Sequence, residues 1–348
     1  MSAVPCMPGV TYVMPVLNEA GYVASAVTSV LVQDYPGPTE VVLVLGPSTD
    51  GTNDTVRQLC AADSRVRSVD NPRAHIPIGL NLAIRASTQP FIVRVDAHSA
   101  LPEDYTRRAV RTLLETGAAN VGGIMVAVGR PGLQAAVAWA YNSRLGLGGG
   151  AYHHADEAPG EAESAYLGVL RRAALAKVGG FDESLRRGED WELNQRLRAA
   201  GYLVWLDPAL RVEYWPRSTW GALARQFYAT GAWRGELVRR LRRRNSLRFF
   251  APPALVVITS TALVLAPLTL TGNGGGVVLV TGLGAAVGPV AYLGLLGCAA
   301  LTGSASPADR LRRCGVLAVM HFAWGTGFLL GVVRGAREVL DTSRARRL

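Results

Sequence analysis

The chain has 348 residues, of which 49% are hydrophobic and 18% charged, and its formal net charge is +10. This length allows one catalytic-sized domain with an accessory region, and the apolar excess after residue 250 excludes an ordinary soluble enzyme. The four cysteines have no metal-binding spacing, which favours reduced, inert thiols. The N-terminal segment lacks the basic-then-apolar pattern of a secretory signal, so we expect a cytosolic catalytic part.

The positive charge is almost entirely arginine, because Lys177 is the one lysine. Seven arginines lie between Arg234 and Arg248, directly before the apolar C-terminal third. Nucleic acid can attract such a basic run. A basic run ahead of an apolar segment is more typical of the cytoplasmic flank of a membrane span. We therefore expect membrane lipids, and no nucleic acid, among the partners.

The first hundred residues alternate short apolar runs with helical patterns. The run at 40–45 is almost continuously apolar, as in a parallel strand that is covered on both faces. Turn and helix-cap residues at 47–52 precede a helix. The expected strands are 9–15, 40–45, 66–69 and 91–95, and the expected helices are 23–32, 54–61 and 78–86.

The alternation continues to about residue 240. The glycine-rich segment 146–164 is expected to be a mobile loop, and its His153 and His154 could bind metal, although adjacent loop histidines are more often solvated. The amphipathic pattern of 219–240 predicts a helix suited to the bilayer surface. We also expect helices at 102–116, at 172–178 and at 189–200, and strands at 121–128 and 203–206. A further helix is expected to follow the strand at 121–128 and to end near residue 145.

Strands and helices alternating at this spacing predict an α/β fold with a doubly wound sheet. In such sheets, ligands bind outside the carboxyl ends of the strands. Glu19, the turn at 48–50 and Asp96 all follow predicted strands. The three should therefore converge on one crevice.

Three apolar stretches, 252–271, 277–301 and 315–333, each reach the roughly 20 residues that a helix needs to cross ~30 Å of hydrocarbon. Arginines precede the first stretch and separate the second from the third, which places both positions on the cytosolic side. Three crossings would then put the arginine-rich tail outside, against the positive-inside rule. Either one stretch does not cross or the tail is an exception, and the sequence leaves both open.

Asp96 and His98 follow the apolar run at 91–95. Two residues apart on an extended chain, their side chains can share one divalent cation, which would neutralise a departing diphosphate. The alternative is a strand-end aspartate that caps the next turn beside an incidental histidine.

Glu189 and Asp190 open a predicted helix. Backbone N–H groups at a helix N-terminus favour an ionised carboxylate. Such a carboxylate can act as general base toward a sugar hydroxyl in an in-line displacement. The alternative is the ordinary preference of acidic residues for helix N-termini, without chemistry.

Six motifs occur in one order across about the first 200 residues, and as a set they resemble family 2 of the inverting GT-A glycosyltransferases. The resemblance covers about residues 9–235. The Asp-Ala-His variant, the Gly46-Pro-Ser turn and the Gly148-Gly-Gly loop are similar to the branch of bacterial exopolysaccharide enzymes typified by the succinoglycan glucosyltransferase. The motifs are Met14–Glu19, Ser48–Thr52, Gly79–Asn81, Arg94–His98, Val178–Glu183 and Gly188–Glu192.

The resemblance implies a GT-A catalytic domain with a mostly parallel sheet over 1–235. A basic interfacial segment at 236–250, about three transmembrane helices at 251–335 and a basic tail at 336–348 would follow it. Within the domain, the positions that match the family's nucleotide-sugar site are Pro15, Leu17, Glu19, Ser48, Asn81 and Asp96.

Asp96 matches the first aspartate of the family's Asp-x-Asp motif and His98 replaces the second, so the resemblance implies a divalent cofactor, Mn²⁺ or Mg²⁺, on this pair. Asp190 matches the catalytic base, with Glu189 beside it. Trp191 follows directly, and Gln226 falls near the acceptor motif of processive relatives.

Three departures from the family pattern are visible. Leu45 and Gly46 stand where the family has acids, so an aspartate that would contact the nucleobase is missing. His98 in place of aspartate weakens the expected preference for Mg²⁺ over Mn²⁺. The Arg-Trp pair of processive enzymes does not follow Gln226, which favours the addition of one sugar over the extrusion of a polymer.

The sequence therefore predicts an inverting, membrane-anchored hexosyltransferase of the bacterial cytoplasmic membrane. Its expected donor is a UDP-linked sugar and its expected acceptor a lipid-linked saccharide at the inner face. A polyprenyl-phosphate sugar synthase is the closest alternative, because its anionic acceptor needs little help from a base. A non-catalytic membrane protein that binds a nucleotide sugar is the alternative from a different class.

Overall fold

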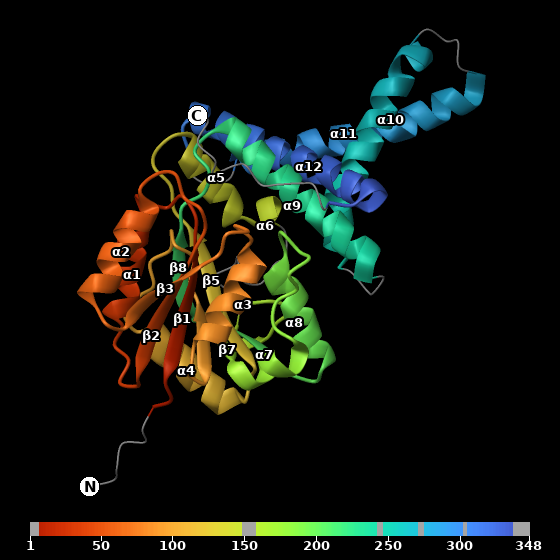
Figure 1. The fold of residues 1–348 in the computed structure, drawn as a ribbon. Helices are drawn as coiled ribbons and strands as arrows, with labels where there is room; N and C mark the ends of the chain where they lie inside the picture. Colours follow the sequence, from red (N-terminus) through yellow and green to blue (C-terminus); the bar gives the residue numbers. More distant parts are fainter. Residues whose placement is uncertain (1–6, 148–157, 242–245, 271–274, 302–304, 337–348) are drawn as a thin grey trace. The chain divides into compact units, whose positions relative to one another are not determined.

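The computed structural model describes residues 7–147, 158–241, 246–270, 275–301 and 305–336, which form two compact units (Figure 1). The first unit comprises Met1–Ala127 and Gly150–Trp215, and the second comprises Val128–Gly149 and Pro216–Leu348. His153 and His154 lie outside the described residues. Among the described cysteines, Cys60, Cys298 and Cys314 are free thiols.

The first unit is built on an eight-stranded, mostly parallel sheet in the order β3-β2-β1-β4-β7-β5-β8-β6. Strand β3 pairs with β2, β2 with β1 and β1 with β4, all in parallel, and β5 also pairs in parallel with β8. This arrangement confirms the predicted α/β class. The strands are β1 (Val10–Val16), β2 (Thr39–Leu45), β3 (Val66–Asp70), β4 (Phe91–Arg94), β5 (Asn120–Ala127), β6 (Gly160–Glu161), β7 (Tyr166–Arg171) and β8 (Val204–Tyr214).

Helices cover both faces of this sheet (Figure 1), and the two-residue repeat of each strand divides its side chains between two cores. Tyr12 and Met14 pack under α1 (Val23–Leu31) with α2 and α4, whereas Val13 packs under α3 with α7 and α8. Both faces being buried explains the unbroken apolar runs of β1 and β2. The other helices are α2 (Thr52–Ala62), α3 (Ile76–Ala86), α4 (Tyr105–Thr116), α7 (Arg172–Val178) and α8 (Glu189–Ala199).

Strand β7 is the main element that the sequence analysis did not anticipate. It lies antiparallel between β4 and β5, in the middle of the sheet. Its Gly168 lies so close to Asn120 that a Cβ there would be 2.2 Å from the Asn120 Oδ1 atom. Asn120 in turn donates to Asn194 Oδ1 at 2.7 Å, which fixes α8 against the sheet.

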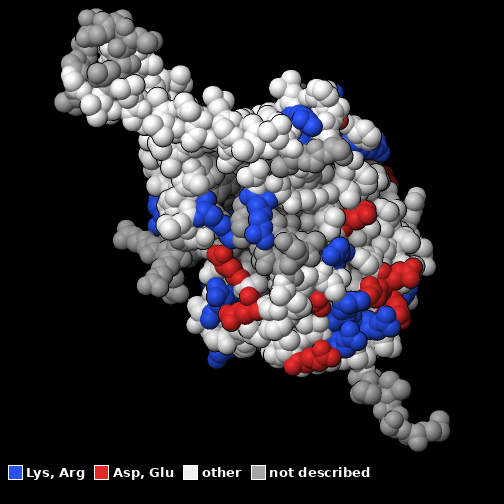
Figure 2. All heavy atoms as spheres, turned by 180° about the vertical axis from the view of Figure 1, so that it is seen from behind, with Lys and Arg blue, Asp and Glu red and all other residues white. Residues whose placement is uncertain are grey.

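The second unit is helical. It contains α5 (Leu133–Tyr141), α6 (Arg144–Leu147), α9 (Trp220–Leu241), the 3-10 helix η2 (Leu247–Phe250), α10 (Ala251–Leu270), α11 (Gly275–Leu301) and α12 (Pro307–Arg334). Three of its helical segments, Leu247–Leu268, Val280–Leu301 and Pro307–Arg334, are long and apolar enough to cross a membrane. The described surface of α10 and α11 carries no acidic or basic side chain (Figure 2), in agreement with the sequence from 251 to 301.

Candidate active site

The site is built on the carboxyl ends of three neighbouring parallel strands, β2, β1 and β4. Because the strands run the same way, the loops that follow them emerge at one edge of the sheet. The loop after β1 carries Leu17 and Glu19, the loop after β2 carries Ser48, and β4 ends two residues before Asp96. The sequence thus places its predicted donor and metal residues at one sheet edge.

The loops after β1 and β2 are held together by four hydrogen bonds between residues 18–20 and 48–52. Asn18 adopts a left-handed conformation (φ 54°), and its backbone N–H donates to Ser48 Oγ at 3.0 Å while its Oδ1 accepts from Thr49 at 2.9 Å. The Glu19 N–H donates to Thr52 Oγ1 at 2.8 Å. The Ala20 N–H donates to the Asp50 carboxylate at 3.2 Å. These bonds fix the two loops before any ligand arrives.

Arg94, the last residue of β4, brings the two halves of the site together. Its guanidinium lies 3.5 Å from Asp96 Oδ1 and 3.1 Å from Glu189 Oε1, and it contacts the Asp190 carboxylate directly. The Arg94 side chain is 8% exposed, so these three carboxylates replace water as its partners. Although burial opposes the charge, Asp190, Asp96 and Glu189 hold the pKa of Arg94 above its ordinary value.

Helix α8 delivers Glu189 and Asp190 to Arg94 in its first turn. The turn begins at Gly188, whose φ of 79° is in the left-handed region that favours glycine. Asn194, one turn further on, joins α8 to Asn120 and to Ser164 through bonds of 2.7 and 3.0 Å. The carboxylates at the start of α8 are therefore fixed by packing at its middle.

The pKa of Asp190 is raised, to about 7, chiefly by desolvation. Arg94 opposes this rise, whereas the Glu189 and Asp96 carboxylates add to it. The side chain is nevertheless 41% exposed, and water in contact with it favours the ionised form. Asp190 is thus an accessible carboxyl whose pKa is raised toward the range in which a general base works well at neutral pH.

The His98 side chain contacts Glu19, in the loop after β1, and Tyr214, at the end of β8. Its Nδ1 is 3.1 Å from Glu19 Oε1, and its ring meets Tyr214 edge-on with centroids 6.3 Å apart. Among the described residues no group of three or more His, Cys, Asp or Glu side chains could enclose a metal. A carboxylate and an imidazole do fit a cation that takes its remaining ligands from a diphosphate, as Mg²⁺ and Mn²⁺ commonly do.

The other predicted site residues have individual environments. Pro15 is half-buried in β1, and Leu17 is 41% exposed beside Gly46. Asn81 donates to Phe181 O at 2.9 Å and to Glu183 Oε1 at 3.0 Å, and its own oxygen accepts from Phe181 N–H. Its amide therefore joins α3 to the loop that precedes α8.

Two of the predicted site residues, Trp191 and Gln226, are expected near the acceptor. Trp191, next to Asp190, donates its indole N–H to Glu163 at 2.9 Å. Gln226 lies in α9 of the second unit and is 9% exposed. The residues grouped around Arg94 belong to the first unit.

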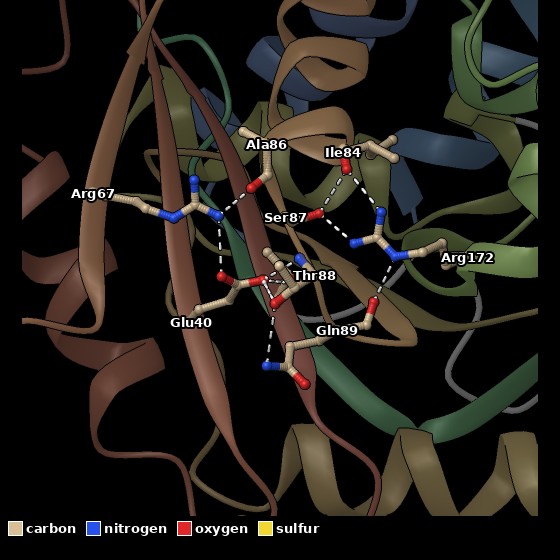
Figure 3. Close-up of polar contacts among 9 residues, drawn as sticks. Glu40, Arg67, Ile84, Ala86, Ser87, Thr88, Gln89 and Arg172 are labelled. Atoms are coloured by element: carbon tan, nitrogen blue, oxygen red, sulfur yellow. Dashed lines mark hydrogen bonds and ion pairs between the residues drawn. The ribbon is translucent and has the colours of Figure 1, made fainter.

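The opposite end of the sheet is closed by a second polar network (Figure 3). Glu40 at the start of β2 accepts from Thr11 Oγ1 and from the Thr88 N–H, at 2.6 and 2.8 Å, and pairs with Arg67 at 3.0 Å. Arg172 at the start of α7 donates to the carbonyls of Gln89 and Ile84, at 2.7 and 2.8 Å. Both arginines thus hold the segment 84–89 that leads into β4, which fixes the strand that carries Arg94.

Sequence reasoning recognised the Arg94–His98 motif but gave Arg94 no role. A signal was present, since Arg94 continues the buried, apolar run of β4 and a charge at such a position requires partners. What the sequence did not reveal was that two of those partners lie 95 and 96 residues away, on α8.

Replacing Arg94 with methionine should destabilise the first unit. It would leave Asp96 and Glu189 without their buried counter-ion, which costs about 3 to 5 kcal/mol when one partner of a buried pair is removed. Urea unfolding of the detergent-solubilised full chain measures the effect. The control is Arg57→Met, because Arg57 and Asp54 form an exposed pair and its loss should leave the midpoint unchanged. Equal midpoints for the two variants would contradict the central role of Arg94.

Comparisons with known proteins show the family to which the chain belongs. A family profile described as "Glycosyl transferase family 2" matches residues 11–178. The succinoglycan biosynthesis protein ExoA of Rhizobium meliloti is 33% identical over 334 residues, which are 95% of each chain. A dolichyl N-acetyl-alpha-D-glucosaminyl phosphate 3-beta-D-2,3-diacetamido-2,3-dideoxy-beta-D-glucuronosyltransferase of Methanococcus voltae is 23% identical over 66% of this chain and 74% of its own.

Among solved structures, the mannosyltransferase PcManGT of Pyrobaculum calidifontis, in complex with GDP-Man and Mn²⁺, shares the fold. The TM-score is 0.57 at 20% identity, with 95% of this chain and 88% of that chain covered. The sheet, the match to the family profile and the full-length relative agree. The chain belongs to glycosyltransferase family 2 and has the GT-A fold.

Proposed function

We propose that this protein is an inverting glycosyltransferase that moves one sugar from a nucleotide diphosphate to a hydroxyl of a lipid-linked saccharide. The observation that carries this proposal is the Arg94 cluster, in which the strand-end Asp96 and the helix-start Asp190 share one guanidinium. In a single displacement, the group that binds the leaving diphosphate and its cation must lie close to the group that accepts the proton of the nucleophile.

The donor binds along the loops after β1 and β2. Pro15, Leu17 and Glu19 would receive the base and ribose, with Ser48 at the facing loop, and the hydrogen bonds between the loops pre-organise this surface. Asp96 and His98 would hold a Mn²⁺ or Mg²⁺ ion, which supplies positive charge to the departing diphosphate when it is bound. Asn81 acts on the site indirectly, because its amide fixes the loop that leads to α8.

Asp190 is the proposed general base. It accepts the proton of the acceptor hydroxyl as that oxygen forms a bond to C1 of the sugar. The bond from C1 to the diphosphate oxygen breaks on the opposite face, so the anomeric configuration inverts. Arg94 holds the Asp190 carboxylate in place through one terminal nitrogen of its guanidinium, and the neighbouring Glu189 contacts the other.

The proposed acceptor and location follow from the second unit and the relatives. Helices α10 and α11 expose apolar side chains suited to a bilayer, which would bring the enzyme to lipid-bound substrates. The ExoA relative acts in succinoglycan biosynthesis, and the archaeal relative is named for a dolichyl phosphate-linked substrate. UDP is the proposed donor nucleotide, and the inner face of the bacterial cytoplasmic membrane is the proposed site of action.

Asp190→Asn should reduce kcat by about 10²- to 10⁴-fold, because an amide cannot accept the proton. Donor affinity should change little, since the base acts on the acceptor. Initial rates and calorimetric titration with UDP and Mn²⁺ separate the two effects. The matched control is Asp54→Asn on the exposed surface of α2, which should leave both quantities unchanged. Near-normal turnover of Asp190→Asn would show that the base assignment is wrong.

The activity should also depend on pH through Asp190. Since burial raises the pKa of its carboxyl to about 7, the ionised form predominates above this pH and is lost as the pH falls. We expect kcat/KM at saturating Mn²⁺ to level off above neutral pH and to fall about tenfold per unit on the acid side. The residual activity of Asp190→Asn should lack this acid limb. A wild-type profile that stays level to pH 5 would count against the assignment.

The acceptor distinguishes this proposal from a polyprenyl-phosphate sugar synthase. Purified full-length enzyme is given a panel of UDP- and GDP-linked sugars with either bare polyprenyl phosphate or a polyprenyl-diphospho-sugar. Transfer to the sugar-bearing lipid, with Mn²⁺-dependent release of the nucleoside diphosphate, is the expected result. Transfer to bare polyprenyl phosphate that survives in Asp190→Asn would identify the synthase instead. Nucleotide binding without any transfer would identify a non-catalytic binding protein.

A further inference from the structure

The three candidate membrane helices differ in how much of their surface is available to lipid. In α10 and α11 only 6% of the apolar window is buried, whereas in α12 the value is 39%. Leu263 and Val264 on α10 and Val287 on α11 are 65–70% exposed. By contrast, Val316, Leu317 and Met320 on α12 are fully buried. The apolar face of α12 is therefore packed against protein rather than exposed to lipid.

Helix α9 covers that face through backbone-to-backbone contact. A Cβ added to Gly231 of α9 would lie 2.0 Å from Trp324 O, and one added to Gly235 would lie 2.2 Å from Phe328 O. The reverse contacts are as close, because a Cβ on Gly327 or Gly331 of α12 would lie 2.1 Å from Tyr228 O or 1.9 Å from Ala232 O. Two Gly-x-x-x-Gly pairs thus face each other, and larger residues would force the helices apart.

The contact extends along both helices in a parallel sense. Near the start, the ring of Trp220 lies 3.0 Å from the Cβ position of Gly315. Near the end, Glu236 Oε2 lies 3.0 Å from the Cβ position of Gly335, just past α12. Residue numbers rise together on the two helices, so α9 and α12 point the same way and accompany each other from Gly315 to the end of α12 (Figure 1). Any depth that α12 reaches in a bilayer, α9 must reach too.

The charges on α9 are incompatible with a position across the hydrocarbon core. Glu236 is fully buried and pairs with Arg239 at 2.6 Å and with Arg240. Arg225 and Arg234 lie on the same helix. A helix with four arginines and a glutamate in its length does not span a membrane, since charged side chains at the bilayer centre are strongly disfavoured. Helix α12 cannot cross without it.

We infer that the chain crosses the membrane twice, through α10 and α11, while α12 lies with α9 at the membrane surface on the side of the catalytic unit. The partner of the exposed α10–α11 surface is the acyl core of the bilayer. The partner of the α9–α12 pair is the headgroup region. The C-terminal tail then returns to the side on which the chain entered.

This topology also satisfies the distribution of arginine. The run before α10, the group Arg310, Arg312 and Arg313 at the start of α12, and the tail with Arg344, Arg346 and Arg347 all fall on one side. With three crossings the tail would fall on the other side, against the bias that sets membrane orientation. The inference concerns sidedness and does not depend on the proposed reaction.

Contacts between the helices agree with a surface position for α12. Its Gly325 packs against Pro252 and Val256 at the beginning of α10. On α11, the hydroxyl of Tyr292 is 2.9 Å from His321 Nδ1, and Leu296 O accepts from Cys314 at 3.3 Å. These contacts lie in the first six residues of α10 and in the last ten residues of α11. They therefore involve the half of each hairpin helix that is nearer to the side on which the chain enters and leaves the bilayer.

Single-cysteine labelling tests the inference in the full chain. The four native cysteines are changed to serine, and one cysteine is introduced as Asp54→Cys, Asn273→Cys or Ser343→Cys. These positions report on the catalytic unit, the α10–α11 connection and the tail. A membrane-impermeant maleimide should label Asn273→Cys in intact cells, and should label the other two after the membrane is permeabilised.

Labelling of Ser343→Cys but not Asp54→Cys in intact cells would show an odd number of crossings and overturn the inference. If none of the three cysteines were labelled until permeabilisation, the hairpin would not cross, with the same consequence. If Asp54→Cys and Ser343→Cys were both labelled in intact cells, and Asn273→Cys were not, two crossings would stand. The cytosolic location in the proposed function would then be wrong.

A lysine pair gives a second readout that does not depend on labelling the tail. Thr326 is exposed near the middle of α12, and Leu263 is exposed near the middle of α10. In the Asn273→Cys background, Thr326→Lys should keep the labelling in intact cells, because lysine at a membrane surface reaches water. Leu263→Lys should reduce it, because that lysine enters hydrocarbon. Equal loss in both variants would place α12 inside the bilayer and overturn the inference.

Discussion

One buried guanidinium determines the geometry of this site. Arg94 ends a central strand and is almost completely enclosed, so its charge must be met by carboxylates rather than by water. Those carboxylates come from the loop after β4 and from the first turn of α8, and Arg94 draws the two segments to one point. The same pairing keeps Asp190 close to Asp96 while leaving it open to solvent. The cluster thus joins the loop after β4 to the start of α8 within the first unit.

The two ends of the sheet differ in their polar contacts and in how far their side chains are exposed. At the amino end of β2, Glu40, Arg67 and Arg172 tie the segment before β4 to its neighbours through charged hydrogen bonds. At the carboxyl end, the loops are joined by short polar contacts that leave Leu17 and Asp190 accessible. Rigidity at one end makes the placement of Arg94 at the other reproducible, which the proposed displacement reaction needs because small misplacements of reacting groups are costly.

Much of the fold could be predicted from the sequence, because most strands and helices carry a clear hydrophobic period and cap chemistry. The exceptions are instructive. β7 is short, buried on both faces and antiparallel, and nothing local marks its direction. The convergence of the motifs at one sheet edge followed from parallel topology, whereas the Arg94 pairs join residues 95 and 96 positions apart, beyond any local signal. His98 contacts Glu19 at 3.1 Å, a partner that strand alternation did not suggest.

Gly46 lies directly after β2, and the side chain of Leu17 occupies the space beside it. The Leu17 Cδ1 atom lies 2.8 Å from the position that a Cβ of residue 46 would take. A side chain at residue 46 would meet the far end of the Leu17 side chain, which is 41% exposed and can turn aside into solvent. A single substitution at residue 46 would therefore change the shape of the surface between the loops after β1 and β2 by moving one exposed side chain.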